Sequence, residues 1–150
     1  MSREHEKGMS LIVKTITRLT VGTIFLYGVY IITHGHVSPG GGFAGGVIIA
    51  LAFIHLILAY GKETAFKKLS QSAASVFEST GAMMFLIIAL LGFAGGYFFL
   101  NFLPKGEPFR LFSAGIIPLC NIAISLKVGA GIFAIFVALI LLKLDNLGKK

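Results

Sequence analysis

The chain has 150 residues, of which 56% are hydrophobic and 13% are charged, and its mean hydropathy is +0.90. A soluble domain has about a quarter of its residues charged, so this chain has too little polar material for a water-facing surface. The formal net charge of +7 comes without an arginine-rich patch interleaved with aromatic residues. The composition therefore indicates an integral membrane protein and not a nucleic-acid-binding protein.

Four apolar runs are long enough to cross a bilayer: residues 14–32, 42–60, 78–103 and 115–142. About 20 residues of helix, rising about 1.5 Å each, cross a hydrocarbon core about 30 Å thick. Helices are expected because the backbone must satisfy its own hydrogen bonds in lipid, and the alternation typical of a membrane barrel is absent. The sequence predicts an all-α integral membrane protein with one domain, residues 1–150, and four transmembrane helices.

The basic residues predict the orientation of these helices. Ten of the 13 Lys and Arg residues lie before the first span or at its start, between the second and third spans, or after the fourth span. Lys105 and Arg110 lie in the opposite connections, and Lys127 lies inside a span. The positive-inside rule therefore predicts that both termini lie in the cytoplasm of a cell with the protein in its plasma membrane.

The connection between the second and third spans, residues 61–77, has apolar residues at roughly helical spacing with lysines between them. This pattern is typical of a short amphipathic helix on the membrane surface. A solvated loop explains the same residues equally well, and both readings remain open.

The stretch "HGHVSPGGGFAGG", from His34 to Gly46, stands between the first two spans. It lacks the preceding strand and the terminal Lys-Ser/Thr of a nucleotide-binding loop. Its two histidines have no cysteine or carboxylate near them in sequence, whereas zinc needs three or four ligands. We therefore predict no metal, no cofactor and no nucleotide at this site.

Close helix packing explains the stretch better. Small residues repeat every four positions and let another backbone approach closely, and a proline before a helix is a common start signal. The backbone amides at this helix start also carry partial positive charge. The predicted packing residues are Pro39, Gly40, Gly41, Gly42, Phe43, Gly45 and Gly46, with a second stripe at Gly92 and Gly96 in the third span.

The segment "GHVSPGGGFAGG", the four spans and the "P-x-x-N" stretch from Pro118 to Asn121 resemble the MnhB/MrpB family. Members of this family are small membrane subunits of multisubunit Mrp-type cation/proton antiporters. The resemblance implies sodium/proton exchange by an assembly that needs all its subunits, with other membrane subunits as partners. Lys127, in "LKVGAG", departs from the acidic residue of many bacterial members. It is similar to archaeal relatives whose modules are fused to membrane-bound hydrogenase or sulfur-reducing complexes.

Four polar residues within the spans are candidates for an ion or proton path: Lys127, His55, Glu78 and Asn121. A lysine in mid-membrane is costly and usually faces protein or water, so Lys127 is expected to line a path or pair with a neighbouring subunit's carboxylate. Glu78 either stabilises the start of the third helix or takes part in a relay with His55. The alternative for His55 is a hydrogen-bonded histidine that packs within the bundle. Asn121 is expected to hydrogen-bond between helices or to mark a slightly broken helix around Pro118.

This inventory is small for an independent transporter, which usually has internal repeats and several converging polar groups. No acyl nucleophile with its base, redox-cofactor site or nucleotide fold is present, so no catalytic residue is predicted. The sequence favours a non-catalytic subunit that packs against larger antiporter-like subunits, and the host complex can be redox-driven. The alternative is a self-associating channel or carrier whose glycine stripes build a homo-oligomer.

Overall fold

The structure is a computed structural model that describes residues 9–61, 71–107, 110 and 113–148. Within these residues it contains four long α-helices: α1 (Leu11–His34), α2 (Gly41–Tyr60), α4 (Gln71–Leu91) and α5 (Ile117–Gly148). A short 3₁₀ turn, Gly92–Gly95, follows α4. All four helices are long and apolar enough to cross a membrane, which confirms the predicted all-helical membrane architecture.

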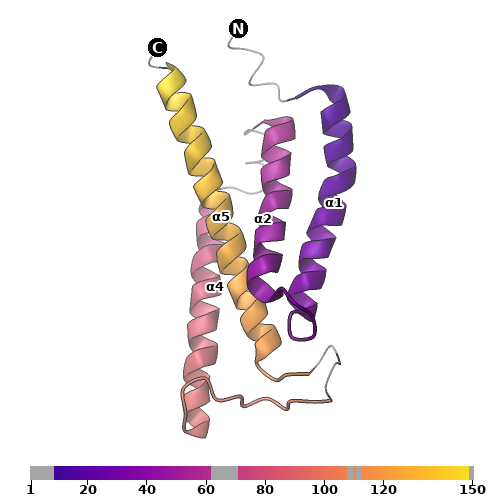
Figure 1. The fold of residues 1–150 in the computed structure, drawn as a ribbon. Helices are drawn as coiled ribbons and strands as arrows, with labels where there is room; N and C mark the ends of the chain where they lie inside the picture. Colours follow the sequence, from indigo (N-terminus) through magenta and orange to yellow (C-terminus); the bar gives the residue numbers. More distant parts are fainter. Residues whose placement is uncertain (1–8, 62–70, 108–109, 111–112, 149–150) are drawn as a thin grey trace.

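The helices lie side by side in the order α1, α2, α5, α4 (Figure 1). α2 packs against α1 on one side and α5 on the other, and α4 packs against α5. α1 begins and α5 ends at the same end of the bundle (Figure 1). The helix that comes last in the sequence therefore lies in the middle of the row.

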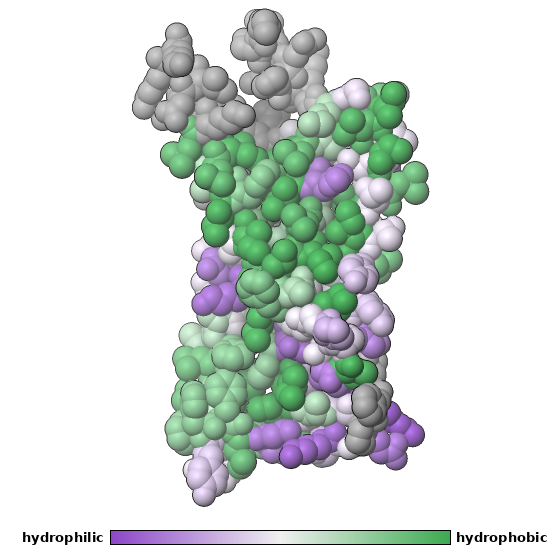
Figure 2. All heavy atoms as spheres, in the orientation of Figure 1, coloured by the Kyte–Doolittle hydropathy of each residue, from purple (hydrophilic) through white to green (hydrophobic). Residues whose placement is uncertain are grey.

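Large apolar side chains cover most of the outside, as expected for a protein whose solvent is lipid or other membrane subunits. Figure 2 shows hydrophobic residues over most of the visible face, with hydrophilic residues gathered at the end that holds the α1–α2 turn and the α4–α5 connection. Three threonines of α1, at positions 15, 20 and 33, fit this surface because each hydroxyl donates to a carbonyl of its own helix. Thr15 bonds to Leu11, and Thr33 bonds to Val29.

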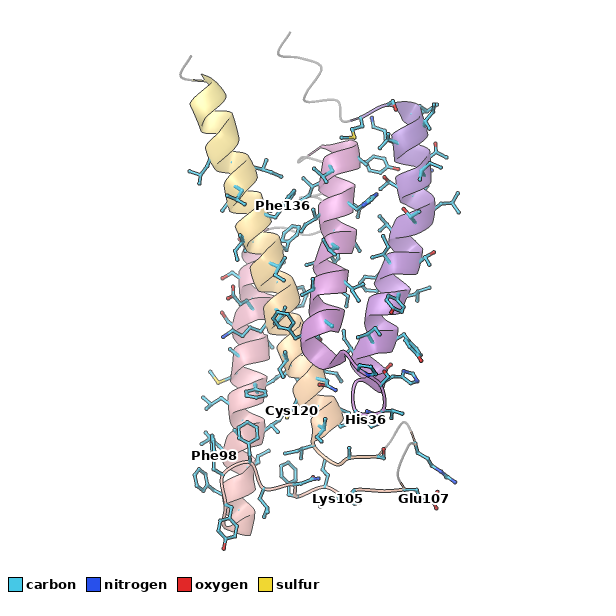
Figure 3. All side chains as sticks on the ribbon, viewed as in Figure 1. His36, Phe98, Lys105, Glu107, Cys120 and Phe136 are labelled. Atoms are coloured by element: carbon cyan, nitrogen blue, oxygen red, sulfur yellow. The ribbon has the colours of Figure 1, made fainter. Side chains whose placement is uncertain are left out.

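An aromatic and aliphatic core joins three helices. Ile57 of α2, Ala74 of α4, and Phe133 and Val137 of α5 form a buried cluster. Phe136 packs against it and lies between α5 and α2 (Figure 3). On one face of the helix row, an apolar hollow of about 270 Å³ is lined by all four helices, including Phe25, Phe53, Phe77 and Ala130.

The third helix differs most from the prediction of residues 78–103. α4 starts at Gln71 and ends at Leu91, because the chain then folds back on itself. Gly92 lies against the backbone of residues 97–100, and Gly96 has a left-handed φ of +105°. The apolar run that follows is rich in aromatic residues, with the Phe98 and Phe99 rings in edge contact at 4.9 Å. Their hydrophobicity does not extend the helix, because the backbone turns at the left-handed Gly96 that precedes them.

The proposed surface helix at 61–77 is described only in part. Residues 62–70 lie outside the described residues, and residues from Gln71 onward already belong to α4.

The start of α4 at Gln71 also corrects one explanation for Glu78. This residue lies about two turns inside the helix, whereas a carboxylate stabilises a helix dipole only within the first turn.

Candidate functional site

The glycine-rich stretch forms the turn from α1 into α2. Pro39 precedes two glycines with positive φ angles, +134° at Gly40 and +67° at Gly41. Side chains other than glycine rarely adopt this region. The two glycines therefore let the chain reverse sharply and start α2 directly beside the end of α1.

One glycine stripe of α2 packs on α5. A side chain at Gly42 would collide with the backbone carbonyl of Asn121, and a Cβ at Gly46 would stand 2.8 Å from the carbonyl oxygen of Ser125. A Cβ at Gly129 of α5 would in turn stand 3.2 Å from the carbonyl oxygen of Gly46. The two backbones are therefore in direct contact, the geometry that small residues permit in membranes.

Gly45 lies on the side of α2 that faces α1. A Cβ at this position would stand 2.9 Å from the carbonyl oxygen of Gly28, and a Cβ at Gly28 would stand 3.2 Å from the carbonyl oxygen of Gly45. The stripes of α2 are thus used within the chain, against α1 and α5. Phe43, between them in sequence, is 63% exposed and points out of the bundle.

Asn121 joins α5 to the start of α2. The backbone N–H of Gly42 donates to Oδ1 of Asn121 over 3.2 Å, inside the bundle. The side chain is 8% exposed, and its Nδ2 has no hydrogen-bond partner among the described residues. The asparagine satisfies one of the free amides that every helix start presents. Nearby Pro118 lies in the first turn of α5, where a missing N–H costs nothing.

Gly92 and Gly96 do not form a helix-packing stripe. Gly92 contacts residues that follow it in its own chain, and a Cβ at Gly96 would meet nothing within 4 Å. Their spacing resembles that of the α2 stripe, but they end α4 instead of bringing two helices together.

Two further polar contacts hold the same end of the bundle. His36 Nε2 lies 3.0 Å from the carbonyl oxygen of Arg110, to which it donates, and so links the α1–α2 turn to the α4–α5 connection. Figure 3 places His36 at this end, near the stretch that carries Lys105 and Glu107. Asn101 Oδ1 accepts the N–H of Ile116 over 3.2 Å just before α5. In the sequence Asn101 stands out as a lone amide in an aromatic run, but the sequence does not indicate its hydrogen-bond partner.

Glu78 and Lys127 lie at the junction of α4 and α5. Gly81 of α4 allows the close approach, since a Cβ there would stand 2.7 Å from both the carbonyl oxygen of Ala123 and the backbone nitrogen of Lys127. Glu78 Oε1 lies 3.7 Å from the position that a Cβ on Gly131 would take. Gly131 follows Lys127 by four residues, one turn along the same side of α5. We call Glu78, Gly81, Lys127 and Gly131 the polar seam.

Lys127 is exposed on the surface of the chain. It lies ten residues into α5, or about 15 Å from the helix start, near the middle of a core about 30 Å thick. A lysine at this depth costs about 2.5–3.5 kcal/mol on insertion scales, and such residues face protein or water instead of lipid. Hydrophilic residues on the flank of α4 interrupt the hydrophobic surface at about mid-height (Figure 2).

His55 does not approach Glu78. It lies between Phe53 and Ile57, which both pack against the Phe133 cluster of α5. At about 100° per residue, His55 points about 200° away from each of them, so it faces away from α5 and is exposed. α5 also lies between α2 and α4 (Figure 1). A relay between His55 and Glu78 within one copy of the chain has no geometric basis.

The chemistry available in the polar seam is limited. A carboxylate and an ammonium can exchange a proton with water or neutralise one another, but they supply no nucleophile with an adjacent base. Within the described residues, no group of three or more His, Cys, Asp or Glu side chains could hold a metal ion. The chemistry that the seam offers is therefore the handling of charge.

The chain is similar to several known proteins. Residues 12–134 match the family described as a domain related to the MnhB subunit of the Na+/H+ antiporter. An uncharacterized protein of Methanocaldococcus jannaschii is 38% identical over 112 residues, covering 70% of this chain and 42% of the relative. A Staphylococcus aureus protein, named as a putative antiporter subunit mnhB2, is 38% identical over 63 residues, covering 42% of this chain and 45% of the relative.

A solved structure is also similar. A chain in the membrane-bound sulfane sulfur reductase, an archaeal respiratory membrane complex, superposes with a TM-score of 0.73 and 34% identity. The match covers 87% of this chain and 58% of that chain. The present chain thus spans less than two thirds of the length of each of these relatives. Because the family match extends over most of the sequence and all four helices, the chain belongs to the family of domains related to the MnhB subunit of the Na+/H+ antiporter.

Proposed function

We propose that the chain is a non-catalytic membrane subunit of an Mrp-type antiporter module and packs against larger antiporter-like subunits in a bacterial or archaeal plasma membrane. The family match over residues 12–134 carries this proposal. The small inventory of ionisable groups within the spans supports it, because an independent secondary transporter needs several converging polar groups.

The host of this module is proposed to be a redox-driven complex. The support is the likeness to a chain of an archaeal sulfane sulfur reductase, with a TM-score of 0.73. In such a host the present chain would contain no redox centre itself and would take part in ion movement. We propose that Lys127 and Glu78 line part of the ion or proton path, while Asn121 stabilises the start of α2.

The alternative of a self-associating channel loses its main support. It relied on the glycine stripes of α2 as homo-oligomer contacts, but these glycines already contact α1 and α5 of the same chain. A second copy cannot occupy the same positions without displacing a helix. A hetero-oligomeric role therefore fits the structure better.

Purification from the native membrane tests the proposal. We expect the chain to elute with several larger hydrophobic subunits, and its deletion to abolish sodium/proton exchange in membrane vesicles. A homo-oligomer that elutes alone and conducts ions in liposomes without any other protein would contradict the proposal. Mass spectrometry of the co-eluting chains decides whether a redox module is attached.

A further inference from the structure

The polar seam is formed by two helices, α4 and α5, and contains glycines as well as charged residues. Each of the two helices contributes one glycine and one charged residue to it. Gly81 brings the backbone of α5 against α4, and Gly131 leaves a space on α5 beside which the Glu78 carboxylate lies. Glu78 is therefore directed toward the side of α5 that carries Lys127.

The backbone positions of α4 and α5 allow the two charged groups to approach one another. Lys127 precedes Gly131 by one helical turn, which corresponds to about 6 Å along the helix. An extended lysine side chain spans this distance. In the described part of the chain no ion pair joins Lys127 or Glu78 to any residue, each other included, so neither charge is paired with a third group.

The surroundings of the seam contain few competing groups. Glu78 is the only titratable residue among the described residues of α4, Gln71–Leu91. On α5, Cys120 lies about two turns from Lys127 toward the helix start. From α2, His55 faces away from α5, as its spacing from Phe53 and Ile57 shows. Among the described side chains of α4 and α5, Glu78 and Lys127 are therefore the only charged groups.

We propose that Glu78 and Lys127 act as one carboxylate–ammonium pair across the α4–α5 junction, and that the ion competing with Lys127 for the carboxylate is a proton. A proton from water adds to the Glu78 carboxylate, gives the neutral acid and releases the ammonium from its counter-ion. Loss of that proton to water restores the pair. This inference rests on the proposed function, since it assigns the seam to the ion path of the assembled complex.

A proton suits this pair better than a metal cation for electrostatic reasons. The seam offers one carboxylate, and the neighbouring ammonium repels a second positive charge. A proton removes the negative charge by forming a covalent O–H bond and needs no further ligands. Pairing would also lower the free-energy cost of placing each charge in the membrane, because buried or membrane-embedded charges are stable mainly when they are paired.

A double-mutant cycle in the assembled complex tests the pairing. Glu78→Gln and Lys127→Met are each expected to lower the exchange rate in vesicles about tenfold or more, as each leaves an unpaired charge in the membrane. The double variant should be no slower than the slower single variant. If the two single effects multiply in the double variant, the residues act independently and the proposal is wrong.

The chain supplies a matched control pair. Glu107 and Arg110 form an exposed ion pair, 2.8 Å between Oε2 and Nε, outside the seam. Glu107→Gln and Arg110→Met, alone and together, should leave the exchange rate within about twofold, as exposed pairs contribute little. The amount of subunit in the purified complex is measured for every variant, and Glu78→Asp and Lys127→Arg, which keep the charges, cover the case in which a neutral variant fails to assemble.

The identity of the ion is tested by the sodium dependence of the same vesicles. In Glu78→Asp the sodium concentration for half-maximal exchange should stay within about twofold of the unmodified complex while the maximal rate falls. A clear rise in that concentration at an unchanged maximal rate would show that Glu78 binds sodium and would overturn the assignment to a proton. Either result leaves the family-based proposal intact, whereas loss of co-purifying subunits from the unmodified chain would contradict that proposal.

Discussion

α5 forms two junctions that differ in chemistry. Its junction with α2 is made of backbone against backbone, with Gly46 and Gly129 in mutual contact and Asn121 bonded to an N–H of α2. Its junction with α4 is equally close at Gly81, but it carries Glu78 and Lys127 at its margin. The first junction joins its two helices by a hydrogen bond, whereas the second leaves two charges unpaired among the described residues. Close packing therefore serves structure in one place and prepares a site for charge in the other.

The largest effect is expected at the α2–α5 junction, from Gly42→Ala. The added methyl group would meet the backbone carbonyl of Asn121, which cannot rotate away. Overpacking costs about 1–3 kcal/mol and sometimes more, and we expect the upper end because the obstacle is backbone. Thermal unfolding of the purified protein in detergent measures the loss, and an unchanged midpoint would show that the two helices are not held at this distance.

A smaller loss of stability is expected for Asn121→Ala. The substitution removes the acceptor of the Gly42 N–H, and a buried donor without a partner costs about 1–3 kcal/mol. Thr33→Val is the control, because that hydroxyl bonds to carbonyls of its own helix. If both variants unfold at the same temperature, Asn121 does not stabilise the start of α2.

At the α4–α5 junction, Gly131→Ala should barely change stability. Its Cβ would lie at ordinary contact distance, 3.7 Å, from Glu78 Oε1, and alanine favours a helix by about 1 kcal/mol over glycine. Gly131→Leu should instead displace the carboxylate and slow exchange by the assembled complex. Exchange and subunit content measured together separate the two cases; equal exchange in both variants would mean that the position of Glu78 is unimportant.

The smallest effect is expected for Gly22→Ala on α1, where a Cβ would meet nothing within 4 Å. This variant should be neutral or more stable by up to about 1 kcal/mol. The same thermal unfolding experiment serves as the baseline for the Gly42 variant. A marked loss would indicate that this face of α1 is covered in the protein as purified.

The sequence predicted the four helices because hydrophobic length is a direct consequence of the thickness of a bilayer. It located the ends of α1 and α2 well, because glycine and proline mark the turn between them. The predicted end of α4 was wrong. The run Tyr97–Leu100 is as apolar as a membrane-spanning segment, but it follows Gly96, whose left-handed conformation turns the chain. Hydrophobicity reports the preference for the membrane and does not report the direction of the chain within it.

The candidate functional residues were harder to place, because contact between two helices depends on which of their faces meet. Lys127 and Glu78 are separated by 49 positions in the sequence, and nothing in their own segments indicates that α4 packs on α5. The expected His55–Glu78 relay relied on both residues lying near the same membrane surface. The sequence does not show that α5 lies between the helices that carry them. Likewise, the spacing of the α2 glycines did not reveal that the helices they contact are α1 and α5.

The central place of α5 has a consequence for biogenesis. α4 packs against α5, yet the ribosome makes α4 first, together with the long connection that follows it. During insertion the side of α4 that carries Glu78 and Gly81 therefore stays uncovered until α5 is inserted between α4 and α2. A stalled chain that ends before residue 117 would expose this intermediate to quality-control proteases, and its lifetime would depend on how well the insertion machinery shelters a single acidic helix.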